Sequence, residues 1–533
     1  MSDDSDRMHP DGPERVLTRE ELLRRGVAGG VALSVLGGQI PNALGALAEP
    51  TIKRGGTFRV GVQGGSDKEV IDAQTSVLDP DAARLTALFD GLLYYDENYK
   101  LRPNLATQFT SKDAKTWTIR IRKGVEFHNG KTLTAADVAW SIRRMLDKSL
   151  GLYATAQLSG LRPVNVRKVD KWTVRLVLDK PNSVLPDAFG QYFMNIVPIG
   201  YKSSKAGGKQ IGTGPYTLVS FTPGNRSELR RNPNYWRHGQ PYFDRVLVLD
   251  LNDDVARVNA LLGGQVDAIT AMPFAQISAA TSRGYKILNS QGGGWVPICM
   301  AVDQPPFTDV RVRQAFRLII DRPQTVQQAF SGYGRVGNDV YSPLDACYDS
   351  ALPQRHQDIA QAKSLLKAAG QENLKIDLVT TNGRAGQVEC AQVFAQQAQK
   401  AGVTVNVKNL DATTFYGNQY LKYPFSTDYW GTRNYLNQVA AGSLVVAPYN
   451  ETHWNDPKFT SLYSEALKTV DQKKRCEVVA EMQKLEYSSG GYIVWGFYNL
   501  VDAYGPKVQG FKPSKGTLPL GSYGNGFRTI AFK

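Results

Sequence analysis

The chain has 533 residues and a formal net charge of +14, with 42% hydrophobic and 21% charged residues. This composition excludes a disordered chain, and the length is sufficient for two or three domains. The positive charge either favours anionic ligands, lipids or cell-wall surfaces or forms a solvated basic surface, since Lys and Arg are spread along the chain. No nucleic-acid-binding module accompanies them, so we expect no nucleic-acid partner.

The amino terminus has the pattern of an export signal over residues 1–48. Arg24-Arg25 precede a short apolar run, and Ala46-Leu47-Ala48 offers a small-x-small cleavage site. The apolar run is too short to span a bilayer as a stable anchor. Residues 18–24 follow a twin-arginine pattern in which Glu20 replaces the second arginine, so export is predicted and its route is left open.

A first strand is predicted over 57–62, where apolar and polar residues alternate. The strand ends in a glycine-rich loop, 63–66. Such a loop either presents backbone amides to a ligand or is a simple turn. On the first interpretation Gly65 and Ser66 are candidate ligand-binding residues.

The stretch 116–137 is the most informative part of the chain. Residues 116–121 alternate as a strand, 129–130 form an Asn-Gly turn, and 134–137 form a capping box that begins a helix. Residues 124–132 look like a phosphate-binding loop, but five residues separate the two glycines where that loop needs four. We therefore do not predict nucleotide binding.

The later part of the chain predicts a βαβ unit. Strand, helix and strand are expected over 374–380, 387–401 and 403–407. Such units place ligand loops at the carboxyl ends of their strands, which here is residues 381–386. Arg384 on this loop is a candidate for binding an anionic group, and an exposed loop arginine is the alternative.

Together these segments resemble the family 5 extracellular solute-binding proteins, which deliver peptides and other solutes to ABC importers. The resemblance covers roughly residues 55–530 and is carried by four segments: 116–137, Gly-Thr-Gly-Pro-Tyr at 212–216, Arg-Asn-Pro-Asn-Tyr-Trp at 231–236, and the helix capped by Asp309. It implies an α/β fold of the periplasmic-binding-protein type II, with two lobes hinged around a central cleft and the extra subdomain of the peptide-binding class. It also implies a monomer without cofactors that closes on a small-molecule or peptide ligand and is recognised by a membrane permease.

The resemblance also suggests where the lobes divide. The first lobe is expected to comprise residues 55–93, 206–295 and 503–533, the extra subdomain 94–205, and the second lobe 296–502. Trp295 stands at the predicted crossover, where it either stacks on a ligand or packs the hinge.

Aromatic residues crowd the segment that aligns with the ligand loop of the family. Tyr416, Trp430 and Tyr435 are candidate ligand-binding residues, with core packing as the alternative. In peptide-binding members an acidic residue after the loop tryptophan pairs with the terminal ammonium of the ligand, and here Arg433 occupies that position. Arg433 either meets a carboxylate, sulfonate or phosphate of the ligand or points into solvent.

Four cysteines, at positions 299, 347, 390 and 476, lie far from the signal, so lipid attachment at the end of the signal is not expected. In an oxidising compartment they form one or two disulfides or remain buried free thiols. No catalytic or metal-binding sequence pattern is present, and the five histidines are scattered. A secreted hydrolase and a receptor that signals to a sensor protein are the alternative functions.

Overall fold

The computed structural model describes residues 52–76 and 78–533. The predicted export signal, 1–48, lies outside these ranges. Among the described residues, no helix has both the length and the apolar character needed to cross a lipid bilayer.

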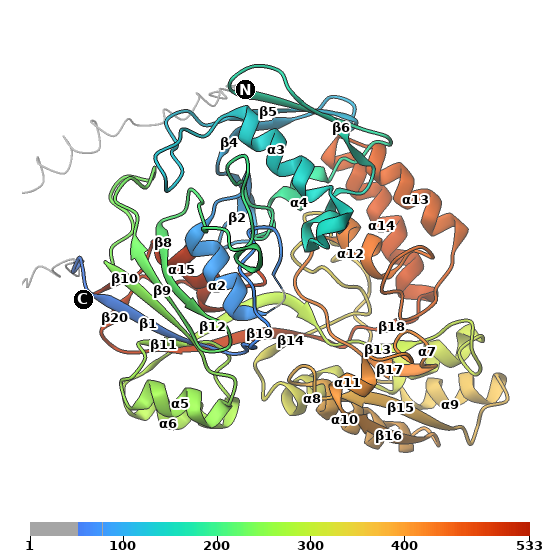
Figure 1. Ribbon diagram of the computed structural model, residues 1–533. Coiled ribbons are helices and arrows are strands. Elements are labelled where there is room, and N and C mark those ends of the chain that lie inside the picture. The colour runs from blue at the N-terminus through green and yellow to red at the C-terminus, as the bar shows by residue number, and fades with distance from the viewer. Residues whose placement is uncertain (1–51, 77) are drawn as a thin grey trace, which may run out of the picture. The chain divides into compact units, whose positions relative to one another are not determined.

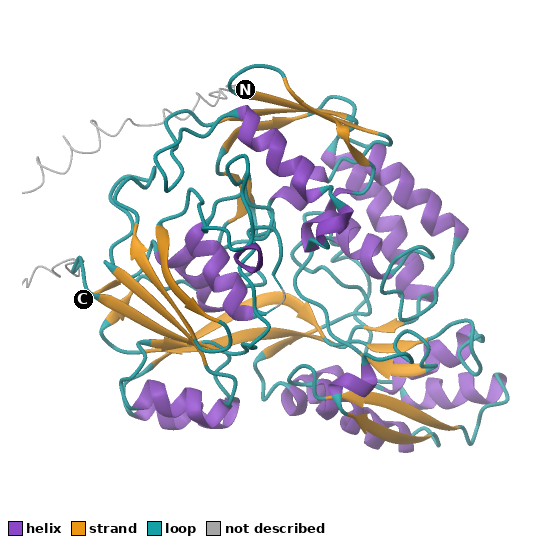
Figure 2. Cartoon of the chain, viewed as in Figure 1, coloured by secondary structure: helices purple, strands orange, loops and turns teal. Residues whose placement is uncertain are grey.

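The first lobe is built on an eight-stranded sheet (Figures 1 and 2). Seven of its strands follow the order β12-β19-β11-β1-β10-β9-β8, and the eighth, β14, pairs with β19. Its strands are β1 (Thr57–Val62), β8 (Tyr216–Thr222), β9 (Arg226–Arg231), β10 (Arg245–Asp250), β11 (Ala268–Ile269), β12 (Lys286–Trp295), β14 (Gly334–Val336) and β19 (Gly496–Tyr504). The predicted first strand is confirmed, and β1 pairs in parallel with both β10 and β11. A small pair, β20 (Val508–Gln509) and β21 (Ala531–Phe532), lies near the carboxyl terminus.

Helices cover both faces of this sheet. On one face, α2 (Asp79–Leu88) and α15 (Pro519–Phe527) bury the apolar side of β1 and β10 in the largest hydrophobic core. On the other, α5 (Asp254–Leu262) and α6 (Ile277–Ser282) pack on a smaller core. Within α15, residues 520–526 all have positive φ, so this segment is a left-handed turn, which its three glycines tolerate more easily than other residues.

The extra subdomain is a four-stranded antiparallel sheet with the order β4-β5-β7-β6. Its strands are β4 (Ala106–Thr110), β5 (Thr116–Ile121), β6 (Leu161–Lys168) and β7 (Thr173–Leu178), and it also contains the hairpin β2 (Leu93–Tyr95) and β3 (Leu101–Pro103) and the helices α3 (Ala135–Met145) and α4 (Leu185–Phe189). The predicted strand at 116–121 and the capping box between Thr134 and Asp137 are confirmed.

The second lobe contains a five-stranded sheet with the order β16-β15-β17-β13-β18. Its strands are β13 (Ile298–Met300), β15 (Lys375–Thr381), β16 (Thr404–Leu410), β17 (Phe425–Thr427) and β18 (Tyr492–Ile493). Its helices are α7 (Val310–Ile319), α8 (Arg322–Ala329), α9 (Ile359–Ala368), α10 (Gln387–Gln399), α11 (Ala412–Phe415), α12 (Tyr435–Gly442), α13 (Pro457–Lys468) and α14 (Gln472–Ser489). The predicted βαβ unit is confirmed, because β15 and β16 pair in parallel and α10 connects them.

Two neighbouring crossovers connect the sheets of the two lobes, and β14 also joins the first sheet from within the second-lobe part of the chain. The chain leaves the first sheet after Trp295 and enters the second at Ile298, and it returns between Ile493 and Gly496. Ile298 pairs with Ile493 in the second sheet, while Trp295 pairs with Phe497 in the first. The strand that follows the return, β19, belongs to the first sheet.

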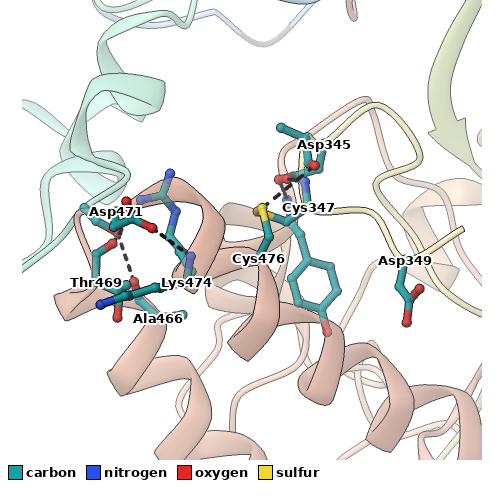
Figure 3. The surroundings of a disulfide bond; sticks show 12 residues. Asp345, Cys347, Asp349, Ala466, Thr469, Asp471, Lys474 and Cys476 are labelled. Atoms are coloured by element: carbon teal, nitrogen blue, oxygen red, sulfur yellow. Dashed lines mark hydrogen bonds between the residues drawn. A yellow bond between two sulfur atoms is a disulfide. The ribbon is translucent and has the colours of Figure 1, made fainter. Parts of the chain in front are cut away.

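A disulfide joins Cys347 to Cys476 at the start of α14 (Figure 3). The other two cysteines, Cys299 and Cys390, are buried free thiols. Of the pairings left open by the sequence, the fold forms one, since only these two cysteines come within bonding distance. Asp345, beside Cys347, accepts a hydrogen bond from the backbone N–H of Cys347 at 2.7 Å.

Candidate ligand-binding cleft

Residues 430–434, here called the ligand loop, connect the second lobe to the rest of the molecule through hydrogen bonds. The carbonyl oxygen of Thr432 accepts hydrogen bonds from Tyr99 Oη at 3.3 Å and from Thr517 Oγ1 at 3.1 Å. Asn434 Nδ2 donates to a carboxylate oxygen of Asp187 in the extra subdomain at 2.7 Å. The ligand loop therefore lies where both lobes and the subdomain meet.

Arg384 lies on the loop between β15 and α10, and its guanidinium contacts tyrosines from both lobes. It donates to Tyr498 Oη at 3.1 Å, and its Cζ lies 4.8 Å from the Tyr498 ring and 5.8 Å from the Tyr429 ring. Tyr498 Oη in turn donates to the carbonyl oxygen of Trp430 at 3.1 Å. Arg384 makes no ion pair with any described carboxylate, so hydrogen bonding to an anion remains open to it.

Asp79 faces this arginine from the first lobe. It is the first residue of α2 and is half-buried, and it interacts electrostatically with Arg384 without forming an ion pair. Burial raises the pKa of Asp79, while the charges of Arg384 and Arg257 oppose that increase. Opposite charges thus stand on the two sides of the cleft.

Arg433 lies on the ligand loop and is half-buried. Its Cζ is 5.0 Å from the centroid of the Trp430 ring, and it forms no hydrogen bond or ion pair with the residues that the structure describes. Trp430 itself is buried and exchanges two backbone hydrogen bonds with Trp295, at 2.9 and 2.8 Å. Cation–π stacking is therefore the contact that holds the Arg433 side chain.

Two of the sequence-predicted aromatic residues lie in the core instead of facing open space. Trp295 is 1% exposed and stacks on Tyr341, with centroids 5.2 Å apart. Tyr435 is 0% exposed and donates from its hydroxyl to Glu486 at 2.7 Å. Both side chains pack the second lobe beside the crossover.

Tyr416 is half-buried behind the Arg384 loop. Its hydroxyl donates to Asp428 Oδ1 at 3.2 Å, and Tyr420 donates to the other oxygen of the same carboxylate at 2.8 Å. Asp428 also accepts from the backbone N–H of Tyr429 at 2.8 Å. Tyr416 therefore helps to position the strand end that presents Tyr429, which is 41% exposed.

Gly65 and Ser66 lie at the carboxyl end of β1. A Cβ atom on Gly65 would lie 2.7 Å from the Cβ of Asp250, and its φ of +115° is one that favours glycine. Asp250 forms an ion pair with the buried Arg84 at 2.8 Å. The hydrogen bonds of Ser66 are to neighbouring residues of its own turn.

A cavity of about 110 Å³ lies near the ligand loop, between the first lobe and the extra subdomain. We call it the tyrosine cavity. Its lining includes Phe89, Asp90, Tyr94, Tyr95, Tyr99, Asn104, Gln191, Tyr192, Thr517, Asn525 and Arg528. Tyr99 joins it to the ligand loop, because its ring lines the cavity and its hydroxyl bonds to Thr432.

Of the predicted site residues, the structure brings together Arg384, Trp430 and Arg433 around the second-lobe side of the cleft. Sequence reasoning did not single out Tyr429, Tyr498 or Asp79. Tyr429 belongs to the noted aromatic cluster, and Asp79 to an Asp-Pro pair at a helix start. Tyr498 had no local signal, because it becomes a neighbour of Arg384 only through the fold. Among the described residues, no group of three or more His, Cys, Asp or Glu side chains could hold a metal ion.

The family model described as "Bacterial extracellular solute-binding proteins, family 5 Middle" matches residues 100–446. The chain belongs to this family. It is the solute-binding component of an ABC importer, and the expected two-lobed α/β fold is confirmed by its similarity to solved members. Members of the family are periplasmic or extracellular proteins that work with a membrane permease.

Curated relatives share about a quarter of their residues with the chain. Heme-binding protein A of Haemophilus influenzae is 24% identical over 78% of this chain and 82% of its own length. Glutathione-binding protein GsiB of Escherichia coli is 24% identical over 83% and 92%, and di/tripeptide-binding protein 1 of Pseudomonas aeruginosa is 25% identical over 77% and 83%. All three are named as binding proteins.

Solved structures match over nearly their whole length. The substrate-binding protein CtaP from Listeria monocytogenes has a TM-score of 0.80 at 22% identity and covers 90% of this chain and 100% of its own. DppA from Helicobacter pylori, in complex with the peptide STSA, has a TM-score of 0.73 at 20% identity over 90% and 98%. At these identities the likeness concerns the fold.

Proposed function

We propose that this solute-binding protein captures an anionic solute, peptide-like or of another small class, between its lobes and delivers it to its permease. Arg384 and Arg433 supply the positive charge, and Tyr429 supplies a flat contact surface. The names of the glutathione-binding and di/tripeptide-binding relatives support a peptide-like ligand.

The observation that carries this proposal is that two arginines on the second lobe contact aromatic rings and form no ion pair with any described carboxylate. Arg384 and Arg433 lie on separate loops, each is held by aromatic rings, and neither forms an ion pair with a carboxylate among the described residues. A guanidinium loses solvation when the cleft closes, and a carboxylate or phosphate would restore its hydrogen bonding. An ammonium group placed at Arg433 would instead be repelled.

Closure is expected to depend on the same residues. Tyr498 comes from β19 of the first sheet, so its hydrogen bond to Arg384 already spans the two lobes. A bound anion would bring further contacts to the second lobe, and a hydrogen-bond donor of the same solute would meet Asp79 on the first. The solute would thus stabilise the closed form by binding it more tightly than the open form.

We further propose that the protein acts by binding alone, as a monomer, without a cofactor or a nucleic-acid partner, and that it is exported. The Cys347–Cys476 disulfide supports an oxidising compartment. The proposal leaves the export route open, because Glu20 replaces the second arginine of the twin-arginine pattern.

The first experiment is native mass spectrometry of the purified chain, to identify any solute retained through purification. Isothermal titration calorimetry then compares Glu-Glu, glutathione and Lys-Lys as probes. We expect the acidic peptides to bind more tightly than Lys-Lys. Replacing either arginine, by Arg384→Gln or Arg433→Gln, should weaken acidic-peptide binding about 10-fold to 100-fold, the worth of one or two charge-assisted hydrogen bonds.

The matched control is Arg311→Gln, because Arg311 is exposed and paired with Asp309 at the start of α7. It should leave the affinity unchanged. Tighter binding of Lys-Lys, or unchanged acidic-peptide affinity in both arginine variants, would contradict the proposal of an anionic solute. A retained cationic solute would do the same.

A further inference from the structure

The tyrosine cavity is formed by parts of the chain other than the second lobe. Its lining comes from the carboxyl-terminal end of α2, the β2–β3 hairpin, residues 190–195 and residues 516–528. It is therefore a different place from the Arg384 loop, although Tyr99 connects it to the ligand loop.

One charged side chain of the cavity lacks a hydrogen-bonding partner in the described part of the chain. Arg528 is 8% exposed and lines the cavity, and its guanidinium forms no hydrogen bond or ion pair with the residues that the structure describes, while its backbone N–H donates to Gly524. Its Cζ lies 5.9 Å from the centroid of the Tyr94 ring. A buried guanidinium without an ion-pair partner is costly unless an anion meets it.

The other charged group of the lining, Asp90, is already satisfied. Its carboxylate accepts hydrogen bonds from Thr213 Oγ1 and Trp236 Nε1, both at 3.0 Å, and from Asn104 Nδ2 at 3.3 Å. These three donors stabilise Asp90 within the protein. The charged group of the lining that lacks hydrogen-bonding partners among the described residues is therefore the Arg528 guanidinium.

The aromatic walls of the cavity favour a ligand in which a flat, largely apolar ring is attached to the anionic group that contacts Arg528. Tyr95 and Tyr99 stack with centroids 4.3 Å apart, and Tyr94 and Tyr192 also line the space. A volume of about 110 Å³ holds roughly seven to eleven water molecules at 10–15 Å³ each, which is the scale of a single-ring acid.

We propose that the tyrosine cavity is a binding site for a small aromatic carboxylate, with Arg528 binding the carboxylate and the tyrosines contacting the ring. This extends the proposed function by adding an anion site in the first lobe. The carboxylate belongs either to a free aromatic acid or to one end of the transported solute, and both present the same chemistry to Arg528.

Benzoate is the probe, titrated by calorimetry into the folded mature chain. We expect saturable binding that Arg528→Gln weakens about 10-fold to 100-fold, since a charge-assisted bidentate contact is lost. Benzamide, which has the same ring without the charge, should bind more weakly than benzoate. Arg528→Lys should recover part of the benzoate affinity because it keeps the charge.

Two readouts separate ligand binding from a structural role of Arg528. Because Arg528→Gln removes an unpartnered buried charge, the ligand-free variant should melt at the same temperature as the wild type or higher. Gln191→Trp should also abolish benzoate binding by filling the cavity, while it leaves Arg528 in place. A lower melting temperature for Arg528→Gln with wild-type benzoate affinity would overturn the proposal, as would absence of benzoate binding by the wild type.

The source of the carboxylate is decided by competition. If Glu-Glu bound in the cleft displaces benzoate, the cavity receives one end of the solute; if both bind together, it receives a separate acid. Arg384→Gln should leave benzoate affinity unchanged. Failure of the acidic-peptide experiment and failure of the benzoate experiment are therefore distinguishable.

Discussion

Removal of the Cys347–Cys476 disulfide should destabilise the second lobe by an amount that its position in the chain allows us to estimate. The two cysteines are separated by 129 residues. Constraining an unfolded chain over a loop of that length corresponds to about 5 kcal/mol at 25 °C in the chain-entropy treatment, and measured losses on removing native disulfides are about 2–5 kcal/mol. We therefore expect Cys347→Ala with Cys476→Ala to lower the unfolding free energy by about 2–5 kcal/mol.

The disulfide should also affect the ligand loop. Asp345 accepts from the backbone N–H of Cys347 and, through its other oxygen, from the backbone N–H of Tyr435, both at 2.7 Å. Tyr435 directly follows the ligand loop and begins α12. Figure 3 shows Asp345 beside the disulfide.

The assay is urea denaturation with and without dithiothreitol, combined with hydrogen exchange of residues 430–435. Reduction should lower the urea midpoint of the wild type and speed exchange at the ligand loop. The double variant is the control, because Cys299 and Cys390 are already free thiols and reductant should not change it further. An unchanged midpoint and unchanged exchange on reduction would refute the reasoning.

Two further predictions concern buried charges. Asp339 pairs with Arg322 at 2.7 Å and with Arg355, and all three are buried or nearly so; Asp339→Asn should therefore cost about 3–5 kcal/mol in urea denaturation, because it leaves Arg322 without a counter-charge. The exposed pair provides the comparison, since Asp309→Asn should cost less than about 1 kcal/mol, and equal losses would contradict the role of burial. Burial raises the pKa of Glu486 to about 7, although the hydroxyls of Tyr341 and Tyr435 oppose the increase. Because this folded-state pKa lies above the unfolded value of 4.5, the contribution of Glu486 to stability is full below that value and is lost as the pH rises through 7. Relative to Glu486→Gln, the wild type should lose up to about 3 kcal/mol between pH 4.5 and 7; parallel stability profiles of the two proteins would show that Glu486 does not titrate in this way.

Local patterns were sufficient for much of the secondary structure. The alternation at 116–121 and the capping box at Thr134 each depend on residues within a few positions of one another, so their conformations follow from nearby chemistry. The βαβ unit around α10 was predictable for the same reason. Its loop placed Arg384 at the carboxyl end of β15, where the structure has it.

The roles of neighbouring aromatic residues required the tertiary structure. Tyr429 and Tyr435 belong to one aromatic segment, yet the first is 41% exposed and the second is fully buried. Their difference depends on what packs around them: Glu486 of α14 accepts from the Tyr435 hydroxyl, whereas Arg384 stacks near Tyr429. Neither partner is close in sequence.

The sequence by itself determined the family and most of the elements, because motifs and periodicity are local. Only the tertiary structure decided that Cys347 pairs with Cys476, that the chain returns to the first sheet at β19, and that the Arg528 guanidinium lies in a cavity without an ion-pair partner among the described residues. Each of these depends on distances between segments far apart in the chain. Such distances are set by packing of the whole core, which no short stretch of sequence specifies.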